Sequence, residues 1–236
     1  MGKIYNRYYD GIESLLSTDD VIFFDNVFPF LIDQFVQQRF IDKSEIGDYS
    51  LTANYLAQKF EDNNGSLIIP FKIYKQAIKG REVEKNTIRR SSKTKALGNV
   101  IKSYEFQNDL LMESLANNVY AHDPNMHTEF NAYLSFVKDT TKKFGLKKFD
   151  HKDDNYADET LVATAFYHAE KNDESVAILT NDNDICRIVD GCIKRDNQMH
   201  GVNNLGPVSV YFLNDFGYGL PIKNVSCLET VVGGYQ

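Results

Sequence analysis

Short apolar runs alternate with amphipathic stretches along this chain, and that alternation restricts its fold more than any other feature. Short runs without charged residues are typical of strands that are buried on both faces of a parallel sheet. Stretches with helical periodicity lie between them, so the sequence predicts a three-layer α/β/α fold with a central, mainly parallel sheet. The four runs are 21-VIFF-24, 67-LII-69, 176-VAILT-180 and 208-VSVYFL-213.

Helical patterning covers much of the chain between these strands. The middle of the chain, about 104–150, is interpreted as a helical insertion within one domain of 236 residues. Polar loops are expected at about 141–155 and at 196–207. The helices are expected at about 4–17, 30–40, 50–60, 71–79, 87–103 and 105–121, after the break at 122–125 to about 139, at 157–171, and as a short helix from about 184.

Acidic residues follow the predicted strands at the point where each strand ends. Asp25 comes directly after the first strand, and Asp182 and Asp184 follow the strand at 176–180. The carboxyl ends of parallel strands lie at one edge of a sheet, where α/β folds bind their ligands. Asp158 opens the helix that precedes the strand at 176–180, although spacing alone does not tell which edge that helix start faces.

A cluster of these four acids has two interpretations. Gathered carboxylates repel one another and burial adds to the cost, so they persist with cations between them. Oxygen ligands suit Mg²⁺ or Mn²⁺, which can activate water for phosphodiester cleavage. The alternative is structural: Asp25 is a turn or N-cap residue, Asp158 is an N-cap or first-turn residue, and the stretch with Asp182 and Asp184 is an Asx-turn followed by an N-cap at Asn183 or Asp184.

Three blocks, taken in order, resemble the PIN-domain nucleases over about 21–213. The first is a strand that ends in Asp-Asn, 21-VIFFDN-26, and the strongest is 158-DETLVATAFYHAEKNDESVAILTNDND-184. The latter has an Asp at the start of an alanine-rich helix and a buried strand that ends in Thr-Asn-Asp-x-Asp. The resemblance implies a Mg²⁺- or Mn²⁺-dependent endoribonuclease that cuts single-stranded or loop RNA. It implies metal-binding and catalytic roles for Asp25, Asp158, Asp182 and Asp184, with support from Asn26, Thr180 and Asn181.

The middle block departs from the family pattern. Residues 68-IIPFKIYKQAIKG-80 supply the strand, the proline and the helix, but Gln76 stands where the family has an acidic residue. An amide oxygen can support a metal site without adding charge, and Glu82 or Glu84 is a substitute from the following turns. The departure leaves a second hypothesis open, in which the chain is a catalytically weakened PIN-like module that binds nucleic acid or serves as a scaffold.

Positive charge is concentrated between Lys72 and Lys102, although the whole chain has a formal net charge of −7. This segment contains ten basic and two acidic residues, a local charge of +8, so the rest of the chain carries −15. Such a segment suits phosphate contacts, and a solvated helix face is the alternative. The residues expected to bind nucleic acid are Lys79, Arg81, Lys85, Arg89, Arg90, Lys93 and Lys95, and a second lysine group comprises Lys142, Lys143, Lys147 and Lys148.

Several other classes of protein are disfavoured. No run approaches the roughly 18 apolar residues of a membrane span, and the polar start 1-MGKIYNRYYDGIESLL-16 does not match a signal peptide, so a cytoplasmic location is expected. The three cysteines lack CxxC spacing, which argues against zinc and disulfide frameworks. Val27 disfavours an Asp-nucleophile phosphatase, which needs a second Asp there. The residues do not separate RNA from DNA as the partner, and a homo-oligomer or an inhibitory partner protein would suit the family.

Overall fold

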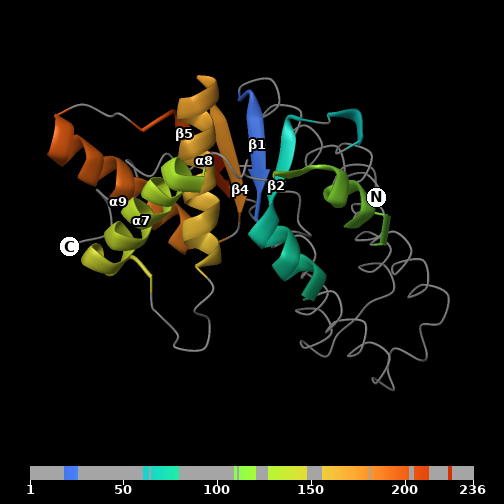
Figure 1. Cartoon of the computed structure of the whole chain (residues 1–236), viewed down its shortest axis with the longest axis horizontal. Coiled ribbons are helices and arrows are strands. Elements are labelled where there is room, and N and C mark those ends of the chain that lie inside the picture. Colours follow the sequence, from blue (N-terminus) through green and yellow to red (C-terminus); the bar gives the residue numbers. More distant parts are fainter. Residues whose placement is uncertain are drawn as a thin grey trace, which may run out of the picture.

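The computed structural model of this chain describes a mainly parallel α/β fold. Six strands form one sheet, and helices pack beside it (Figure 1). The described residues are 19–25, 61–63, 65–79, 109–110, 112–120, 127–147, 156–180, 182–201, 205–212 and 223–224.

The sheet has the order β3-β2-β1-β4-β5-β6. The first five strands in this order are parallel to their neighbours, and β6 is antiparallel to β5. The bounds are β1 Val21–Phe24, β2 Leu67–Pro70, β3 Val119–Tyr120, β4 Val176–Thr180, β5 Val208–Phe212 and β6 Lys223–Asn224.

The two central strands explain why the apolar runs are continuous rather than alternating. Every residue of β1 and β4 is buried, and the strands pair in register, with Phe23 opposite Ile178. A strand covered on both faces has no position that favours a polar side chain. The apolar runs of the sequence therefore correspond to the middle of the core.

The order in which strands are added to the sheet reverses at β1, and the parallel strand β4 lies on its other side. From β1 the chain proceeds outward to β2 and β3, and it then returns to place β4 on the other side of β1, followed by β5. Loops that leave adjacent strands in opposite directions open a crevice at their carboxyl ends, where open α/β sheets bind ligands. This topological switch point lies at the ends of β1 and β4.

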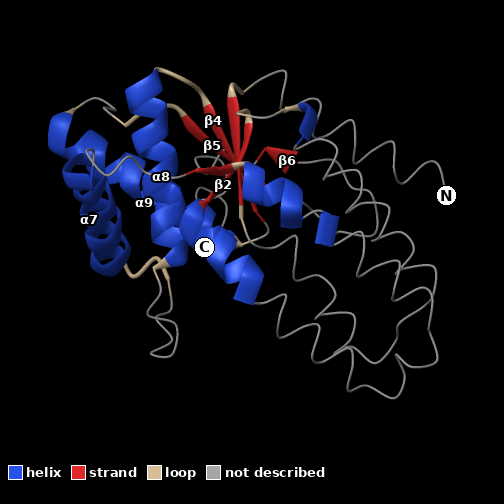
Figure 2. Cartoon of the chain, turned by 45° about the vertical axis from the view of Figure 1, so that its right-hand side comes forward, coloured by secondary structure: helices blue, strands red, loops and turns tan. Residues whose placement is uncertain are grey.

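The described helical layer consists of α7 (His127–Phe144), α8 (Ala157–Asn172) and α9 (Asn183–His200). Helix α8 lies between the sheet and the other two helices, since it contacts β2, β4 and β5 as well as α7 and α9. It is accordingly buried along most of its length, which its alanine-rich sequence permits. Figure 2 shows α7, α8 and α9 together on one side of the strands.

Gly206 is required where the chain passes the C-terminal end of α8 on its way to β5. A side chain at this position would overlap the Cβ atom of Ala169 and the backbone of Glu170. Glycine therefore allows the approach to β5 to pack directly on α8.

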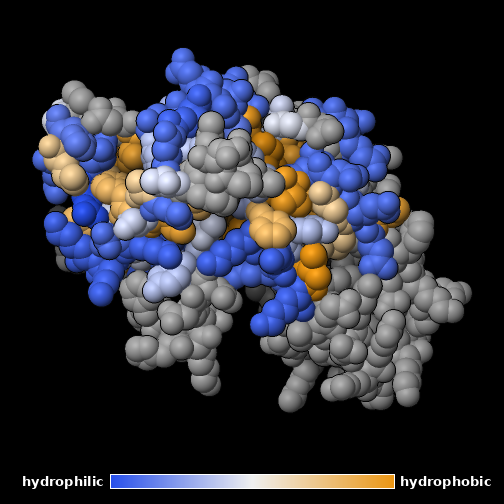
Figure 3. All heavy atoms as spheres, in the orientation of Figure 1, coloured by the Kyte–Doolittle hydropathy of each residue, from blue (hydrophilic) through white to orange (hydrophobic). Residues whose placement is uncertain are grey.

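Hydrophilic residues cover much of the described surface in the view of Figure 3.

The structure confirms the α/β class and the parallel character of the sheet, together with the strands at 21–24, 67–70, 176–180 and 208–212 and the helices at 71–79 and 157–172. The second helical layer of a three-layer fold stays a prediction. The expected helices before residue 61, and the one over 87–103, lie outside the described residues.

Three expectations about the boundaries of elements were wrong. The range 105–121 is not one helix, because β3 forms at Val119–Tyr120 and joins the sheet beside β2. The range 104–150 thus supplies a strand of the sheet and, in α7, part of the helical layer. Helix α7 continues through 141–144, and α9 runs on through 196–200, where loops were expected.

Two further observations concern the class of protein. No helix of the described residues is long and apolar enough to cross a membrane. Cys186 takes part in a disulfide, so the expectation of unpaired cysteines is wrong for this residue. Cys192 is buried and free.

Candidate functional site at the carboxyl edge of the sheet

One threonine hydroxyl joins the ends of β1 and β4. Thr180 Oγ1 donates a hydrogen bond of 2.7 Å to Asp25 Oδ2 and accepts one of 2.9 Å from the backbone N–H of Asp182. Asp25 is only 5% exposed, and its N–H continues the strand ladder with a bond to the carbonyl of Leu179. The Asp25 carboxylate is therefore held at the topological switch point.

Asp182 and Asp184 both stabilise the start of α9. Asp182 is the N-cap residue, and its Oδ1 accepts a hydrogen bond of 2.8 Å from the N–H of Asp184. Asp184 lies in the first turn and forms an ion pair of 3.1 Å with Arg187. The N-cap is thus Asp182, whereas the structural interpretation placed it at Asn183 or Asp184, and both acids also lie at the carboxyl end of β4.

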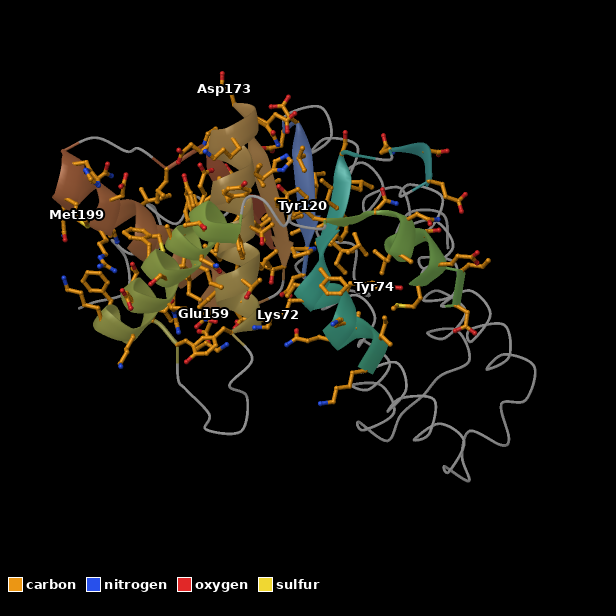
Figure 4. The ribbon with its side chains drawn as sticks, in the orientation of Figure 1. Lys72, Tyr74, Tyr120, Glu159, Asp173 and Met199 are labelled. Atoms are coloured by element: carbon orange, nitrogen blue, oxygen red, sulfur yellow. The ribbon has the colours of Figure 1, made fainter. Side chains whose placement is uncertain are left out.

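Asp158 lies at the same edge, which settles the question that spacing left open. The N-terminal end of α8 faces the carboxyl ends of the strands, and Asp173, after its C-terminal end, lies at the opposite side of the sheet (Figure 4). Asp158 forms an ion pair with Lys147, and both side chains are largely buried, at 18% and 22% exposure. A lysine ammonium is therefore the cation that accompanies this acid.

Other acids at this edge also act on Lys147. Burial lowers the pKa of its ammonium, but the hydrogen bond to Asp158 and the charge of Asp158 raise it. The charges of Glu159 and Asp182 add to that effect, so the pKa of Lys147 lies above its usual value. Lys147 therefore pairs with Asp158 and also feels the charges of Glu159 and Asp182.

The end of α7 determines where Lys147 lies. Gly145 ends the helix with a left-handed φ of 59°, and the N–H of Leu146 bonds to the carbonyl of Thr141. Leu146 then packs on α9 at Gly191, where any side chain would overlap it. This capped and anchored turn presents the next residue, Lys147, to Asp158.

Glu159 is a site residue that the sequence analysis missed. It is only 1% exposed, and its Oε2 atom has no hydrogen-bond partner among the described residues. Its charge acts on both Lys72 and Lys147, and Figure 4 labels Glu159 on α8 and Lys72 on the helix after β2. Its position directly after Asp158 was a weak signal, because an acid in a first helical turn usually interacts only with the helix dipole.

Two lysines gather around the ring of Tyr156, the N-cap residue of α8. The Nζ atom of Lys138 lies 4.1 Å from the ring centroid and that of Lys72 lies 5.9 Å from it. Burial, followed by the charge of Lys138, lowers the pKa of Lys72, although Glu159 and Asp158 partly oppose this. The sequence analysis placed Lys72 at the start of a basic segment but gave it no role, and Lys138 lay outside both lysine groups.

Of the other residues predicted for the metal site and for nucleic-acid binding, the structure describes Gln76 and Lys79. Gln76 is half-buried and Lys79 is exposed, both on the helix at 71–79 that follows β2. Asn26, Arg81, Lys85, Arg89, Arg90, Lys93, Lys95 and Asn181 lie outside the described residues.

The donor atoms at this edge suit a hard divalent cation, since they are carboxylate and hydroxyl oxygens. Within the described ranges, however, no three acidic, histidine or cysteine side chains lie close enough together to hold a metal ion. Lys147 instead binds Asp158. The arrangement brings the acids to one edge without forming a closed coordination shell.

Comparison with family models, with curated proteins and with solved structures gave no match.

Proposed function

We propose that this chain is a metal-dependent phosphodiesterase of the PIN-like type, an endoribonuclease that acts on single-stranded or loop RNA. The observation that supports this most is the Asp25 carboxylate, buried and bound to Thr180 at the switch point of a parallel sheet. That edge also receives Asp158 and Asp182 from two other elements. Acids on separate elements of one ligand-binding edge are what metal-assisted hydrolysis requires.

Each residue has a distinct role in this proposal. Asp25, Asp158 and Asp182 would hold Mg²⁺ or Mn²⁺, with Asp184 further out, and the bound ion would supply an activated water for attack on phosphorus. Thr180 keeps the Asp25 carboxylate oriented through its hydrogen bond. Lys147 neutralises Asp158 in this structure, and Asp158 would have to leave that pair to hold an ion.

The second candidate is a nucleic-acid-binding or scaffold module with the same fold. It is favoured by the Lys147–Asp158 ion pair, which stabilises the acid without a metal, and by Gln76, which brings no charge. In this reading the acids cap helices and balance lysines, and the lysines bind nucleic acid.

Cleavage of a mixed RNA pool in the presence of Mn²⁺ separates the two candidates. We expect cleavage by the native protein, nearly complete loss in Asp25→Asn, and little further loss in a variant that also carries Asp182→Asn, because the acids act as one unit. Asparagine can still accept the hydrogen bond from Thr180, so the fold should persist. The matched control is Asp190→Asn, since Asp190 is similarly buried on α9 and pairs with Lys194.

Two results of this cleavage assay would contradict the proposed nuclease activity. If the native protein and Asp25→Asn both leave the pool intact over a range of Mg²⁺ and Mn²⁺ concentrations, the proposed nuclease is refuted. If Asp190→Asn loses as much activity as Asp25→Asn, the loss reflects the fold rather than the acidic edge.

A further inference from the structure

Three lysines lie at the corner of the molecule beside the acidic edge. Lys72 lies in the helix after β2, Lys138 lies on α7, and Lys147 follows α7. These three lysines come from segments far apart in the sequence and meet at the N-terminal end of α8. Like charges gathered in this way repel one another, so the arrangement favours an anion among them.

Charges of both signs act on Lys72. Lys138 and Lys147 repel its ammonium, whereas Glu159 and Asp158 attract it. Lys147 is already paired with Asp158, so Lys72 and Lys138 are the two lysines that can face a phosphodiester group.

Tyr156 holds the two remaining ammonium groups in place. Both Nζ atoms lie over its ring, as in cation–π contacts. The residue has φ 45° and ψ 39°, a left-handed conformation that costs a tyrosine free energy, and its side chain makes no capping hydrogen bond to α8. Backbone strain of this kind persists where the surrounding structure holds it, and here the strained residue is the one whose ring contacts both Lys72 and Lys138.

The N-terminal end of α8 also favours an anion at this place. The first N–H groups of a helix have no partner within the helix and point toward an anion. Lys72, Lys138 and Tyr156 are each half-buried rather than enclosed, so a phosphate group can reach them from solvent.

We propose that Lys72 and Lys138, positioned by the Tyr156 ring, bind one phosphodiester group of a single-stranded RNA next to the acidic edge. This inference rests on the proposed function, because it names the subsite that would hold the strand beside the site of cleavage. Lysine ammonium groups contact phosphate as point charges without reading the base. The subsite therefore orients the strand and carries no sequence preference.

Binding of a fluorescent uridine decamer, followed by anisotropy in EDTA across a salt titration, tests the subsite without cleavage. Lys72→Gln and Lys138→Gln should each weaken binding about tenfold at low salt, as expected for a lost hydrogen bond to a charged group. Each should also lower the slope of log K against log salt by about 0.7. Tyr156→Asn keeps a residue that accepts a left-handed φ, and it should weaken binding about two- to fivefold.

Lys171→Gln is the matched control. It removes the same charge from the far end of α8, where Lys171 pairs with Glu129, and it should bind the decamer like the native protein. Melting temperatures of all variants show whether each is folded. The same losses with a thymidine decamer also support the subsite, because the phosphodiester is the group that the two strands share.

Failure of this inference can be told apart from failure of the proposed function. If Lys72→Gln and Lys138→Gln bind like Lys171→Gln, or if the native protein does not bind the decamer, the subsite is refuted, whatever the cleavage assay shows. If both variants lose binding while the native protein cuts no RNA with Mn²⁺, the subsite stands and the nuclease does not.

Discussion

Replacing Lys147 with methionine tests whether a lysine occupies the place of a metal ion at the acidic edge. Methionine retains an unbranched side chain of similar length and removes the ammonium that binds Asp158. The pair is largely buried, at 22% and 18% exposure, so solvent screens it only partly. A hydrogen bond to a charged group contributes about 1.5–3 kcal/mol. Without divalent ions, the melting temperature should fall by about 3–12 °C for a chain of this size.

The free energy of the Lys147–Asp158 pair also sets the effect of the substitution on metal affinity. Losing the pair lowers the melting temperature but should tighten the binding of a metal ion. In the native protein an ion that binds Asp158 must first break the pair with Lys147, whereas in Lys147→Met it finds the carboxylate free of that partner. A difference of about 1.5–3 kcal/mol corresponds to roughly 10- to 100-fold tighter binding of Mn²⁺. Excess Mn²⁺ should therefore raise the melting temperature of the variant more than that of the native protein.

Free Mn²⁺ measured by electron paramagnetic resonance gives the dissociation constants, and calorimetry checks them. Lys143→Met is the control, because Lys143 is exposed near the end of α7 and lies over the ring of Phe144. If Lys147→Met and Lys143→Met bind Mn²⁺ with the same affinity, Lys147 does not compete with the ion. If neither variant nor the native protein binds Mn²⁺ at millimolar concentration, the acidic edge is not a metal centre.

Three further predictions concern single residues. Thr180→Val removes the hydroxyl that joins Asp25 to the N–H of Asp182 and should lower the free energy of unfolding by about 1–3 kcal/mol in urea titrations; an unchanged midpoint would contradict the role given to Thr180. Gln76→Glu adds the charge that position 76 lacks and should tighten Mn²⁺ binding, whereas unchanged affinity would mean that position 76 lies outside the site. Burial raises the pKa of Cys192 to about 12, an effect that Thr140 and Arg195 only partly oppose. Its thiol should therefore resist alkylation at pH 8 in the native state, and rapid native-state labelling detected by mass spectrometry would contradict this expectation. The contribution of the protonated thiol to stability, complete below pH 9, should be lost as the pH rises toward 12.

The strands and α8 were predictable because their signals are local. A continuous apolar run or an alanine-rich helix reports burial on both sides, wherever the partner elements come from. The two residues of β3 carry no periodicity, and their strand conformation arises from pairing with β2. The last turn of α7 has a polar sequence that suggested a loop. It stays helical because Thr140 and Thr141 are buried and bond to carbonyls one turn back.

Helix α9 shows how tertiary packing overrides local propensity. It contains a glycine at its middle, Gly191, and several residues with poor helix propensity. One face nevertheless buries Ile188, Val189 and Cys192, and the glycine is the point where Leu146 packs. Neither contact can be read from the sequence of α9 alone, because Leu146 belongs to a different segment.

The positions of the acids in the candidate site could be predicted from the sequence, whereas the positions of the lysines beside them could not. The difference lies in how many elements place each residue. An acid after a strand is placed by that one element, so Asp25 and Asp182 could be assigned to an edge in advance. The position of Lys147 depends on how the end of α7 is capped and on how it packs against α9. Lysines supply part of the positive charge beside these carboxylates: Lys147 for Asp158, and Lys72 near Glu159. An acid that a lysine neutralises does not require a metal ion beside it, so acids at the switch point do not by themselves establish catalysis. What separates a nuclease from a binding module is whether a divalent ion can displace Lys147.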